Sequence, residues 1–464
     1  MNKYNLLFIF SDQHRACDLN CYGNKQIKSP NFDKLSSQSL QFYNCISNTP
    51  VCVPIRGSIL TGYHPNSHKA LTNDMPIDIK IKSIADVLTE NNYNTGYIGK
   101  WHLGSIPRNR FIDKHERMGF KEWKVANCTH DYNQSYYYDE DNKYYNIKGY
   151  ESNFQTDLAL DFIERNNNSV KPWALYLSFG PPHNPYQTAP EYFKKIYENL
   201  DIRLRDNVKE QTIVNLKGKK YLNKNKIIES YKGYYSHITA LDDCLGRLMS
   251  KINKLNISEK TIIVYTSDHG DMLGSHGHLN KQQPWYESIN VPLLISLPRR
   301  IIPQKTMEII SLTDLPTTIL GILKLKFDDV RHGHDLHTSI LDQKIFKGLD
   351  STYISNPIPC HQGLDAGIKE WYGIKTKEWT YVETLQKGYN KLYNDIYDKF
   401  QLENLIYNNE YSETLSLLKI KLHNHMKKVD DEFIPWKDVI IKNNLVDEWN
   451  SSQRWFKRPI EELI

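Results

Sequence analysis

A single cysteine stands in an unusual setting in the segment TPVCVPIRGSILTGYHP, residues 49–65. Pro54 suits the first turn of a helix and Gly62 suits its end, so a helix is predicted to begin near Cys52. Free backbone N–H groups and the helix dipole attract anions at such a start. Arg56 follows about one turn later, and its guanidinium can return to the same anion. A buried cysteine can also serve packing alone, so the chemical interpretation needs partner residues.

Two similar pairs of polar residues follow apolar runs that read as buried strands. Asp12 and Gln13 come after NLLFIF, and Asp268 and His269 come after TIIVYT. In open α/β sheets, ligands bind beyond the carboxyl ends of the strands. Two carboxylates, an amide oxygen and an imidazole suit one divalent cation; the oxygens favour Ca²⁺ or Mg²⁺, and the imidazole also admits Mn²⁺ or Zn²⁺. Either pair alone is equally typical of a helix N-cap, but two pairs at strand ends favour a metal site.

Other strand ends supply lysines and histidines. KWHLG gives Lys100 and His102 after the run NTGYIG, and PPHNP gives His183 after WALYLSF. The segment GSHGHLNK adds three further candidates, His276, His278 and Lys281. Lysine brings a fixed positive charge, and histidine exchanges protons near neutral pH. Each of these segments alone is typical of a surface loop. Their shared position at strand ends indicates a site where a tetrahedral oxyanion faces a metal and two lysines.

Short apolar runs alternate with amphipathic segments over the first three quarters of the chain. The runs read as buried parallel strands and the segments between them as helices, which indicates an α/β domain with helices on both faces of the sheet. The expected strands are 5–10, 94–99, 173–179, 261–266 and 291–297, and the expected helices are 84–92, 154–166, 234–255 and a late helix at 312–325.

The pattern of polar and apolar residues changes after about residue 345. KEWYGIKTKEWTYVETLQKGYNKLYNDIYD alternates polar and apolar residues, as antiparallel strands do, and SETLSLLKIKLHNHMKKVDDEF reads as a helix. A chain of 464 residues also exceeds what one core usually supports. We therefore predict a catalytic α/β domain at 1–345 and a smaller α+β subdomain at 346–464 that contains a short antiparallel sheet and contributes to the substrate pocket.

Charge and composition exclude several classes of function. The formal net charge of +5 is small for this length, and the basic cluster at 216–226 is expected to be a solvated loop, so no nucleic-acid partner is expected. No segment approaches the roughly 20 apolar residues of a membrane span. Neither a signal peptide nor a paired metal spacing among the seven cysteines is evident, so we expect a cytoplasmic protein with reduced thiols.

The motifs, taken in order, resemble the type I sulfatases of the alkaline phosphatase superfamily. CVPIRGSILTG matches the C-x-P-x-R-x-x-x-x-T-G element of that family. The resemblance continues through SDQHRACDLNCYGN, GKWHLG, PPHNPY, SDHGDMLGSHGHLNK, YESINVPLLI and LYNDIYDKFQLENL, so it covers nearly the whole chain. It implies an alkaline phosphatase-like fold, with a large, mostly parallel sheet sandwiched by helices, and a sulfuric ester hydrolase activity.

The resemblance also implies a role for each candidate residue. The cysteine at position 52 would be oxidised to Cα-formylglycine by a formylglycine-generating maturation enzyme. One divalent cation, for which we expect Ca²⁺, would be held by Asp12, Gln13, Asp268, His269 and the modified residue 52. Arg56 would support the formylglycine, Lys100 and Lys281 would bind the sulfate oxygens, His102 would act on the formylglycine hydroxyl, and His183 would lie near the leaving-group oxygen. Gln13 and His269 stand where many sulfatases have Asp and Asn.

The implied reaction is hydrolysis of a sulfate monoester. One hydroxyl of the hydrated aldehyde attacks sulfur, His102 deprotonates the other, and the aldehyde re-forms as sulfate leaves. His183 or Lys281 protonates the departing alkoxide, while the cation and the basic side chains stabilise the transition state. The alternatives are a phosphonate monoester hydrolase or phosphodiesterase, a choline or aryl sulfatase, and a binding protein with unmodified Cys52.

The substrate is expected to be a small sulfated saccharide, such as a glycosaminoglycan fragment. Segments 203–211 and 360–371 are predicted to line the pocket for the leaving group, although no individual substrate-binding residue is assigned. Aromatic and histidine side chains in such loops would suit the apolar face and the hydroxyls of a sugar ring.

Overall fold

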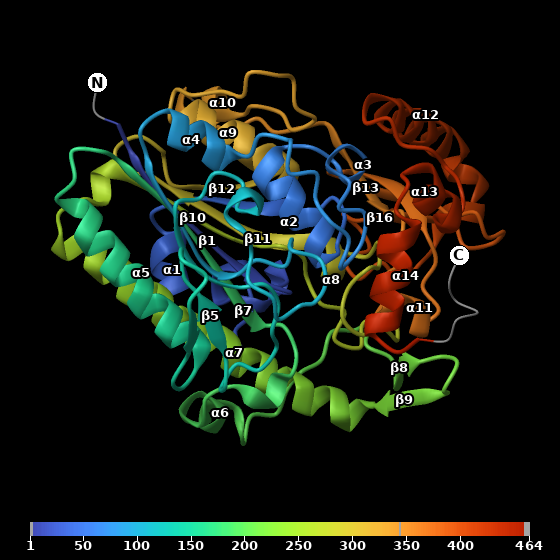
Figure 1. The fold of residues 1–464 in the computed structure, drawn as a ribbon. Coiled ribbons are helices and arrows are strands. Elements are labelled where there is room, and N and C mark those ends of the chain that lie inside the picture. The colour runs from blue at the N-terminus through green and yellow to red at the C-terminus, as the bar shows by residue number, and fades with distance from the viewer. Residues whose placement is uncertain (1–2, 343–344, 459–464) are drawn as a thin grey trace.

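The first two thirds of the chain contain the strands of one large, ten-stranded sheet (Figure 1). The computed structural model describes residues 3–342 and 345–458. The strand order is β12-β2-β11-β10-β1-β7-β3-β4-β5-β6. In chain order these strands are β1 (Asn5–Asp12), β2 (Leu40–Ile46), β3 (Asn94–Lys100), β4 (Glu122–Ala126), β5 (Tyr136–Tyr138), β6 (Tyr144–Asn146), β7 (Trp173–Pro182), β10 (Thr261–Ser267), β11 (Asn290–Ser296) and β12 (Gln304–Ser311).

The centre of the sheet is parallel. Strands β10, β1, β7, β3 and β4 pair in parallel, so their carboxyl ends meet at one edge of the sheet. The expectation of a parallel strand at 291–297 was wrong, because β11 runs antiparallel to both β10 and β2. β11 is buried along its whole length, and burial on both faces makes a strand apolar whichever way it runs.

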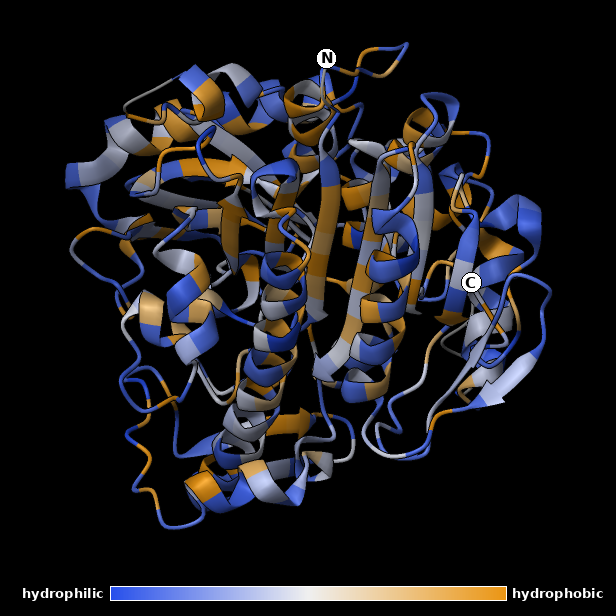
Figure 2. Ribbon diagram, turned by 90° about the vertical axis from the view of Figure 1, so that its left-hand side faces the viewer, coloured by the Kyte–Doolittle hydropathy of each residue, from blue (hydrophilic) through white to orange (hydrophobic). Residues whose placement is uncertain are grey.

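Helices cover both faces of this sheet, as predicted. Along β1 the side chains alternate: Leu6, Phe8 and Phe10 belong to one core, and Leu7 and Ile9 to the other, as a strand buried on both faces requires. The first core is closed by α2 (Cys52–Thr61), α4 (Ile84–Glu90) and α9 (Leu315–Ile322), and the second by α1 (Pro30–Ser36), α5 (Glu151–Asn167) and α7 (Lys224–Lys254). Figure 2, which faces the side of α5 and α7, shows apolar strands behind two helices that carry many hydrophilic residues.

The C-terminal part forms a second, smaller sheet, as expected. Its four antiparallel strands follow the order β13-β14-β15-β16 and are β13 (Ser351–Asn356), β14 (Trp371–Thr376), β15 (Trp379–Glu383) and β16 (Lys391–Asn394). Helix α12 (Ser412–Lys428) covers it through Leu418, Leu422 and Met426. The remaining helices there are α11 (His361–Asp365), α13 (Trp436–Lys442) and α14 (Val446–Trp455).

The small sheet packs firmly on the large one. Ile46, Ile289 and Ile309 share a buried cluster with Ile354 and Val382. The side-chain amide of Asn48 also donates to the backbone oxygen of Tyr353 at 2.7 Å. The proposed boundary at residue 345 stays a prediction. None of the helices in the described ranges is long and apolar enough to cross a lipid bilayer.

The basic segment 216–226 is solvated but is more ordered than the expected loop. It contains the turn and second strand of a hairpin formed by β8 (Gln211–Asn215) and β9 (Lys220–Asn223), and then the first residues of α7. Asn223 caps that helix by accepting a hydrogen bond from the backbone N–H of Lys226. The remaining α-helices of the described residues are short: α3 (Pro65–His68), α6 (Glu191–Tyr197), α8 (Tyr286–Ile289) and α10 (His337–Asp342).

Shortening a side chain in the middle of the large sheet should destabilise the fold strongly. Leu175 of β7 is fully buried in the core closed by α5 and α7. We expect Leu175→Ala to lower the free energy of unfolding by about 2–5 kcal/mol, since it removes buried methyl groups and leaves a cavity. Thermal and urea unfolding would measure this. Val330→Ala is the control, because Val330 is 90% exposed and its loss should change stability by no more than about 0.5 kcal/mol. Equal stabilities of the two variants would contradict the packing described.

Candidate active site

The carboxyl ends of the parallel strands deliver the polar residues to one place. Asp12 ends β1, Lys100 ends β3, Asp268 follows β10 and His183 follows β7. The registers Ser11↔Ser267 and Phe10↔Ser178 align these ends across the sheet. Helix α2 begins above them at Cys52 and ends at Thr61. The next residue, Gly62, has φ 72°, the left-handed conformation that glycine adopts readily just after a helix end. The predicted helix and its position are therefore confirmed.

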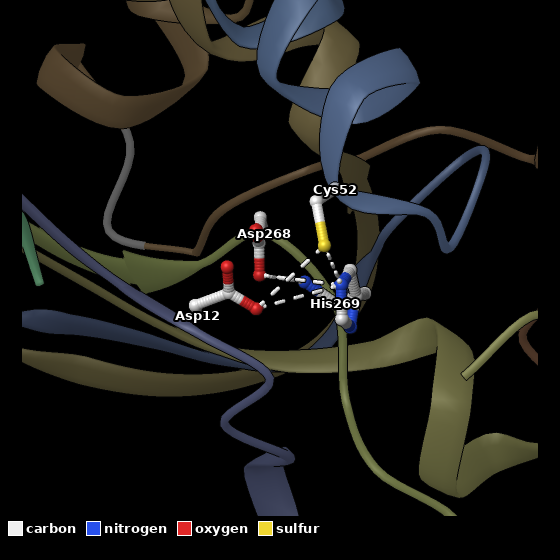
Figure 3. Close-up of side chains that lie close together, drawn as sticks. All are labelled: Asp12, Cys52, Asp268 and His269. Carbon is white, nitrogen blue, oxygen red and sulfur yellow. Dashed lines mark hydrogen bonds and ion pairs between the residues drawn. The ribbon is translucent and has the colours of Figure 1, made fainter. Parts of the chain in front are cut away.

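Four side chains form a compact set of possible metal ligands (Figure 3). One ligand atom from each of Asp12, Cys52, Asp268 and His269 lies within 4.8 Å of the others, and all four residues are buried. The sulfur of Cys52 points from the start of α2 toward this set, 3.2 Å from Nε2 of His269 and 3.8 Å from Oδ1 of Asp12. Carboxylate oxygens and an imidazole nitrogen at this spacing can hold one divalent cation.

The ring of His269 is oriented for ligation. Its Nδ1 lies 2.9 Å from the backbone oxygen of Gly270. Since a carbonyl can only accept, Nδ1 must carry the proton. Nε2 then faces Cys52 and Asp12, where its lone pair would be available to a bound cation. Metal-binding histidines usually donate their second ring nitrogen to such a partner, so the local geometry fits a cation.

Arg56 compensates the two buried carboxylates. Its Nε donates to Asp268 at 3.0 Å and its Nη2 to Asp12 at 3.2 Å, while Nη1 donates to Oγ of Ser178 at 2.8 Å and to the backbone oxygen of Lys100 at 2.9 Å. Burial alone would raise the pKa of Asp12, but the nearby charges, with Lys100 and Arg56 among the largest, hold that pKa well below its ordinary value. Asp12 is therefore a carboxylate, as a cation site requires.

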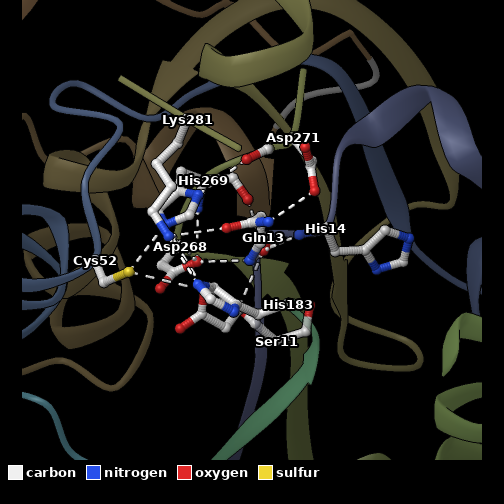
Figure 4. A network of polar contacts seen from close by, with 12 residues as sticks. Ser11, Gln13, His14, Cys52, His183, Asp268, His269, Asp271 and Lys281 are labelled. Atoms are coloured by element: carbon white, nitrogen blue, oxygen red, sulfur yellow. Dashed lines mark hydrogen bonds and ion pairs between the residues drawn. The ribbon is translucent and has the colours of Figure 1, made fainter. Parts of the chain in front are cut away.

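Gln13 is held in place from three sides (Figure 4). Its backbone N–H donates to Asp268 at 3.0 Å, its Nε2 donates to Asp271 at 2.7 Å, and its Oε1 accepts from Nζ of Lys281 at 2.9 Å. The hydrogen bond to Asp271 thus orients the amide of Gln13 so that its Oε1 faces the site. The backbone of Gln13 has φ 70°, an uncommon left-handed conformation for a residue other than glycine.

Lysines and histidines surround the space beside the ligand set. Nζ of Lys100 lies 2.6 Å from Asp12 and 3.4 Å from Nε2 of His130. Nζ of Lys281 lies 2.8 Å from Nε2 of His183, and the rings of His130 and His183 stack with their centroids 4.4 Å apart. Lys100 and Lys281 are both buried. Two fixed positive charges and two stacked imidazoles therefore face one region.

His102 is buried nearby without a hydrogen-bond partner on either ring nitrogen. Burial, and then the charge of Lys100, lower its pKa well below the ordinary value, so its ring is neutral. Its backbone also has a left-handed φ, 61°. A neutral, unpartnered imidazole next to Lys100 is available to accept a proton from a group that binds there.

Hydrogen bonds and ion pairs join most of the predicted residues into one network. Its predicted members are Asp12, Gln13, Cys52, Arg56, Lys100, His183, Asp268, His269 and Lys281. His102 is the exception, and the catalytic role of each residue stays a prediction. His276 and His278 lie outside the network, since both rings pack on Trp285.

Sequence reasoning missed three members of the site. Asp271 positions Gln13 by accepting a hydrogen bond from its amide. The hydroxyl of Tyr186 donates to the same carboxylate. His130 follows β4, a short strand of mixed polarity. The motif SDHGD contained Asp271, and recognising β4 would have placed His130 at a strand end.

The two segments predicted to line a substrate pocket pack beside the Lys281 loop. Asn207 donates to Glu287 at 2.8 Å, and Val208 bridges to Ser275. In the second segment, the backbone N–H of Cys360 donates to Oε1 of Gln282 at 2.8 Å. Both segments therefore border the site, while their contact with a substrate stays a prediction.

Comparisons with known proteins agree with this geometry. The family model described as "Sulfatase" matches residues 4–325, and that described as "N-sulphoglucosamine sulphohydrolase, C-terminal" matches residues 274–428. The chain is similar to an ulvan-active sulfatase of Formosa agariphila, with 32% identity over 93% of this chain and 82% of that protein.

Solved structures share the fold over nearly the whole length. A protein in complex with its substrate D-glucosamine-2-N,6-O-disulfate superposes with a TM-score of 0.82 at 22% identity, covering 93% of this chain and 97% of its own. The phosphonate monoester hydrolase of Agrobacterium radiobacter has a TM-score of 0.74 at 19% identity, covering 92% and 96%. These likenesses confirm the mostly parallel sheet flanked by helices. The family model, the relative and the motif residues together show that the chain belongs to the sulfatase family.

Proposed function

We propose that this protein hydrolyses sulfate monoesters of saccharides and that Cys52 is matured to formylglycine, the precursor of the nucleophile. The observation that carries the proposal is the position of Cys52. Its sulfur lies at the buried start of a helix, among two carboxylates and an imidazole that can hold a divalent cation. The relative from Formosa agariphila is named as an ulvan-active sulfatase, and one structural neighbour was solved with a disulfated glucosamine as its substrate, which supports a saccharide as the leaving group. A maturation enzyme that oxidises Cys52 is the implied partner.

The cation site fits the expected metal by its donor set. Asp12, Asp268 and His269 would hold the ion with residue 52, and the predominance of oxygen donors supports Ca²⁺. Oε1 of Gln13 already faces this region through Lys281 and is the candidate further ligand. When bound, such an ion stabilises negative charge on oxygen.

Fixed positive charge is the main contribution of the chain itself. Lys100 and Lys281 present two ammonium groups at the edge of the ligand set, and both are buried. In a water-poor site such charges act strongly on the oxygens of a sulfate group. Arg56 is already committed to Asp12 and Asp268, so it anchors the carboxylates and the start of α2.

Proton transfer falls to the histidines on either side. Nδ1 of His183 donates to the backbone oxygen of Asn184 at 2.7 Å, which leaves Nε2 to accept from Lys281. The proton shared between Nζ of Lys281 and Nε2 of His183 is therefore the one that either residue can give to a leaving oxygen. His102, neutral and without a hydrogen-bond partner, is our candidate for the group that takes a proton from residue 52.

Removing the side chain at position 52 should abolish turnover while leaving the fold intact. We expect Cys52→Ala to release no sulfate above background and to unfold near the temperature of the parent. The matched control is Cys21→Ala, which removes a free cysteine outside the network and should keep activity. Mass spectrometry of the peptide that contains residue 52 checks maturation, because the thiol sulfur is exchanged for an aldehyde oxygen. Full activity of Cys52→Ala would overturn the proposal.

Chelation of divalent cations should inactivate the protein reversibly. We expect EDTA to remove activity and Ca²⁺ to restore it better than Mg²⁺, Mn²⁺ or Zn²⁺. Melting temperature provides a second readout, because a ligand that binds only the folded state stabilises it. Re-addition of Ca²⁺ should therefore raise the melting temperature of both the parent and Cys52→Ala. An enzyme that keeps full activity and an unchanged melting temperature in EDTA would contradict a cation site.

The choice between sulfur and phosphorus esters can be measured directly. The phosphonate monoester hydrolase shares the fold, so both reactions suit the architecture. We expect kcat/KM for an aryl sulfate to exceed that for the matching aryl phosphonate and aryl phosphate by at least about tenfold, or about 1.4 kcal/mol in transition-state binding. Sulfated mono- and disaccharides then define the sugar. A clear preference for a phosphorus ester would replace the sulfatase assignment.

A further inference from the structure

A small pocket lies between the loop that carries Lys281 and the C-terminal sheet. Its volume is about 170 Å³, which is below the about 300–1,000 Å³ typical of pockets for whole drug-sized ligands. It therefore suits a single ring. The lining comes from residues 278–285 on one side and from residues 367–391 on the other. Such seams between packed parts of a chain are frequent sites of ligand binding.

The inner wall of this pocket is apolar and rigid. Trp285, Ile368, Trp371 and Val382 line it, and all four are buried. The indole N–H of Trp371 donates to the backbone oxygen of Gln282 at 2.8 Å, and that of Trp285 donates to the hydroxyl of Tyr393 at 3.1 Å. Both indoles are thus fixed. His276 stacks on Trp285, and the apolar surface that remains in the pocket suits the C–H face of a sugar.

The rim of the same pocket is positively charged. Lys391 lies with its Nζ 5.1 Å from the centre of the Trp285 ring, and Lys369 is exposed at the opening. No acidic side chain of the described residues lies within ion-pair distance of either lysine. His278 accepts at Nδ1 from the side-chain amide of Gln283, at 3.2 Å, so its Nε2 carries a proton as a further donor. Cationic donors above an apolar floor match a ring that bears an anionic group.

The pocket is close to the candidate active site along the chain. Lys281 points into the site, and Gln283, two residues later, lines the pocket. Their Cα atoms are at most about 7.6 Å apart, twice the spacing of consecutive residues. Gln282, between them, is fixed through its hydrogen bonds with Cys360 and Trp371. Lys281 therefore faces the candidate active site and Gln283 faces the pocket, while Gln282 between them is held in place by hydrogen bonds.

We propose that this pocket, lined by Trp285, Trp371, Lys369 and Lys391, binds a second sulfated sugar residue of an oligosaccharide, separate from the ring whose ester is cleaved. The inference rests on the proposed function for its substrate class. Binding of a second sugar in the pocket adds affinity that a monosaccharide does not obtain. The protein therefore prefers longer sulfated chains to single sugars.

Binding tests the pocket without turnover. In the Cys52→Ala background, we expect the double variant Lys369→Ala/Lys391→Ala to raise the Kd for a sulfated tetrasaccharide about tenfold, since two charged contacts are lost. Tetrasaccharides from ulvan, heparin and chondroitin sulfate are the probes, and the best binder of the three is used. Lys419→Ala is the control, because Lys419 is exposed on α12 and its replacement also removes a positive charge from the C-terminal part. The Kd of this variant for the tetrasaccharide should stay unchanged. Lys369→Ala alone, at an exposed position, guards against a folding defect of the double variant.

Steady-state kinetics of the active protein gives a second test of the pocket. In the active protein, we expect the ratio of KM for the tetrasaccharide to KM for a monosaccharide sulfate to rise about tenfold in the double variant and to stay constant in Lys419→Ala. Equal Kd values for the double variant and its control, or no binding of any of the three tetrasaccharides, would overturn the pocket assignment. Failure of the parent to release sulfate from any ester would instead overturn the proposed function, while the binding arm still decides the pocket.

Discussion

Two carboxylates buried side by side are the constraint on which this site depends. Asp12 and Asp268 are fully buried, and a buried charge is strongly destabilising unless it is paired and hydrogen-bonded. Arg56 bridges both, and Lys100 adds a second cation on Asp12. These partners compensate both buried charges, and they hold the pKa of Asp12 well below its ordinary value. Since Arg56 belongs to α2, the same ion pairs fix the start of that helix and the position of Cys52 over the strand ends.

The parallel sheet makes this convergence possible. Strands β10, β1, β7 and β3 end together, so residues that are far apart along the chain arrive within one small volume. The helices on both faces pack the sheet into two separate apolar cores and leave this edge free for polar side chains. The C-terminal sheet then closes the structure around the Lys281 loop through Gln282, Cys360 and Trp371. Residues of that part can therefore vary without any change in the candidate metal ligands Asp12, Asp268 and His269.

Much of this arrangement could be predicted from the sequence, and the exceptions have physical reasons. Asp12, Asp268 and Lys100 follow strongly apolar strands, so their place at one edge followed from topology. Strand β2 was not predicted, because it contains the polar residues Gln41 and Asn44. Both are buried, and their side-chain amides donate to backbone oxygens of other segments. A hydropathy pattern does not reveal such hydrogen bonds. The direction of β11 is set by its neighbours, since an apolar run carries no direction. Asp271 acts only through Gln13, a partner about 260 residues away, so its role needed the folded chain.

The left-handed backbones of Gln13 and His102 bear on attempts to make this protein more robust. Each such conformation costs a residue other than glycine about 1–3 kcal/mol, so a screen for thermostability alone would favour glycine at both positions. The gain in melting temperature would come with the loss of an amide and an imidazole that no neighbour replaces. Engineering of this scaffold should therefore leave both buried positions unchanged and seek stabilising substitutions on the exposed surface.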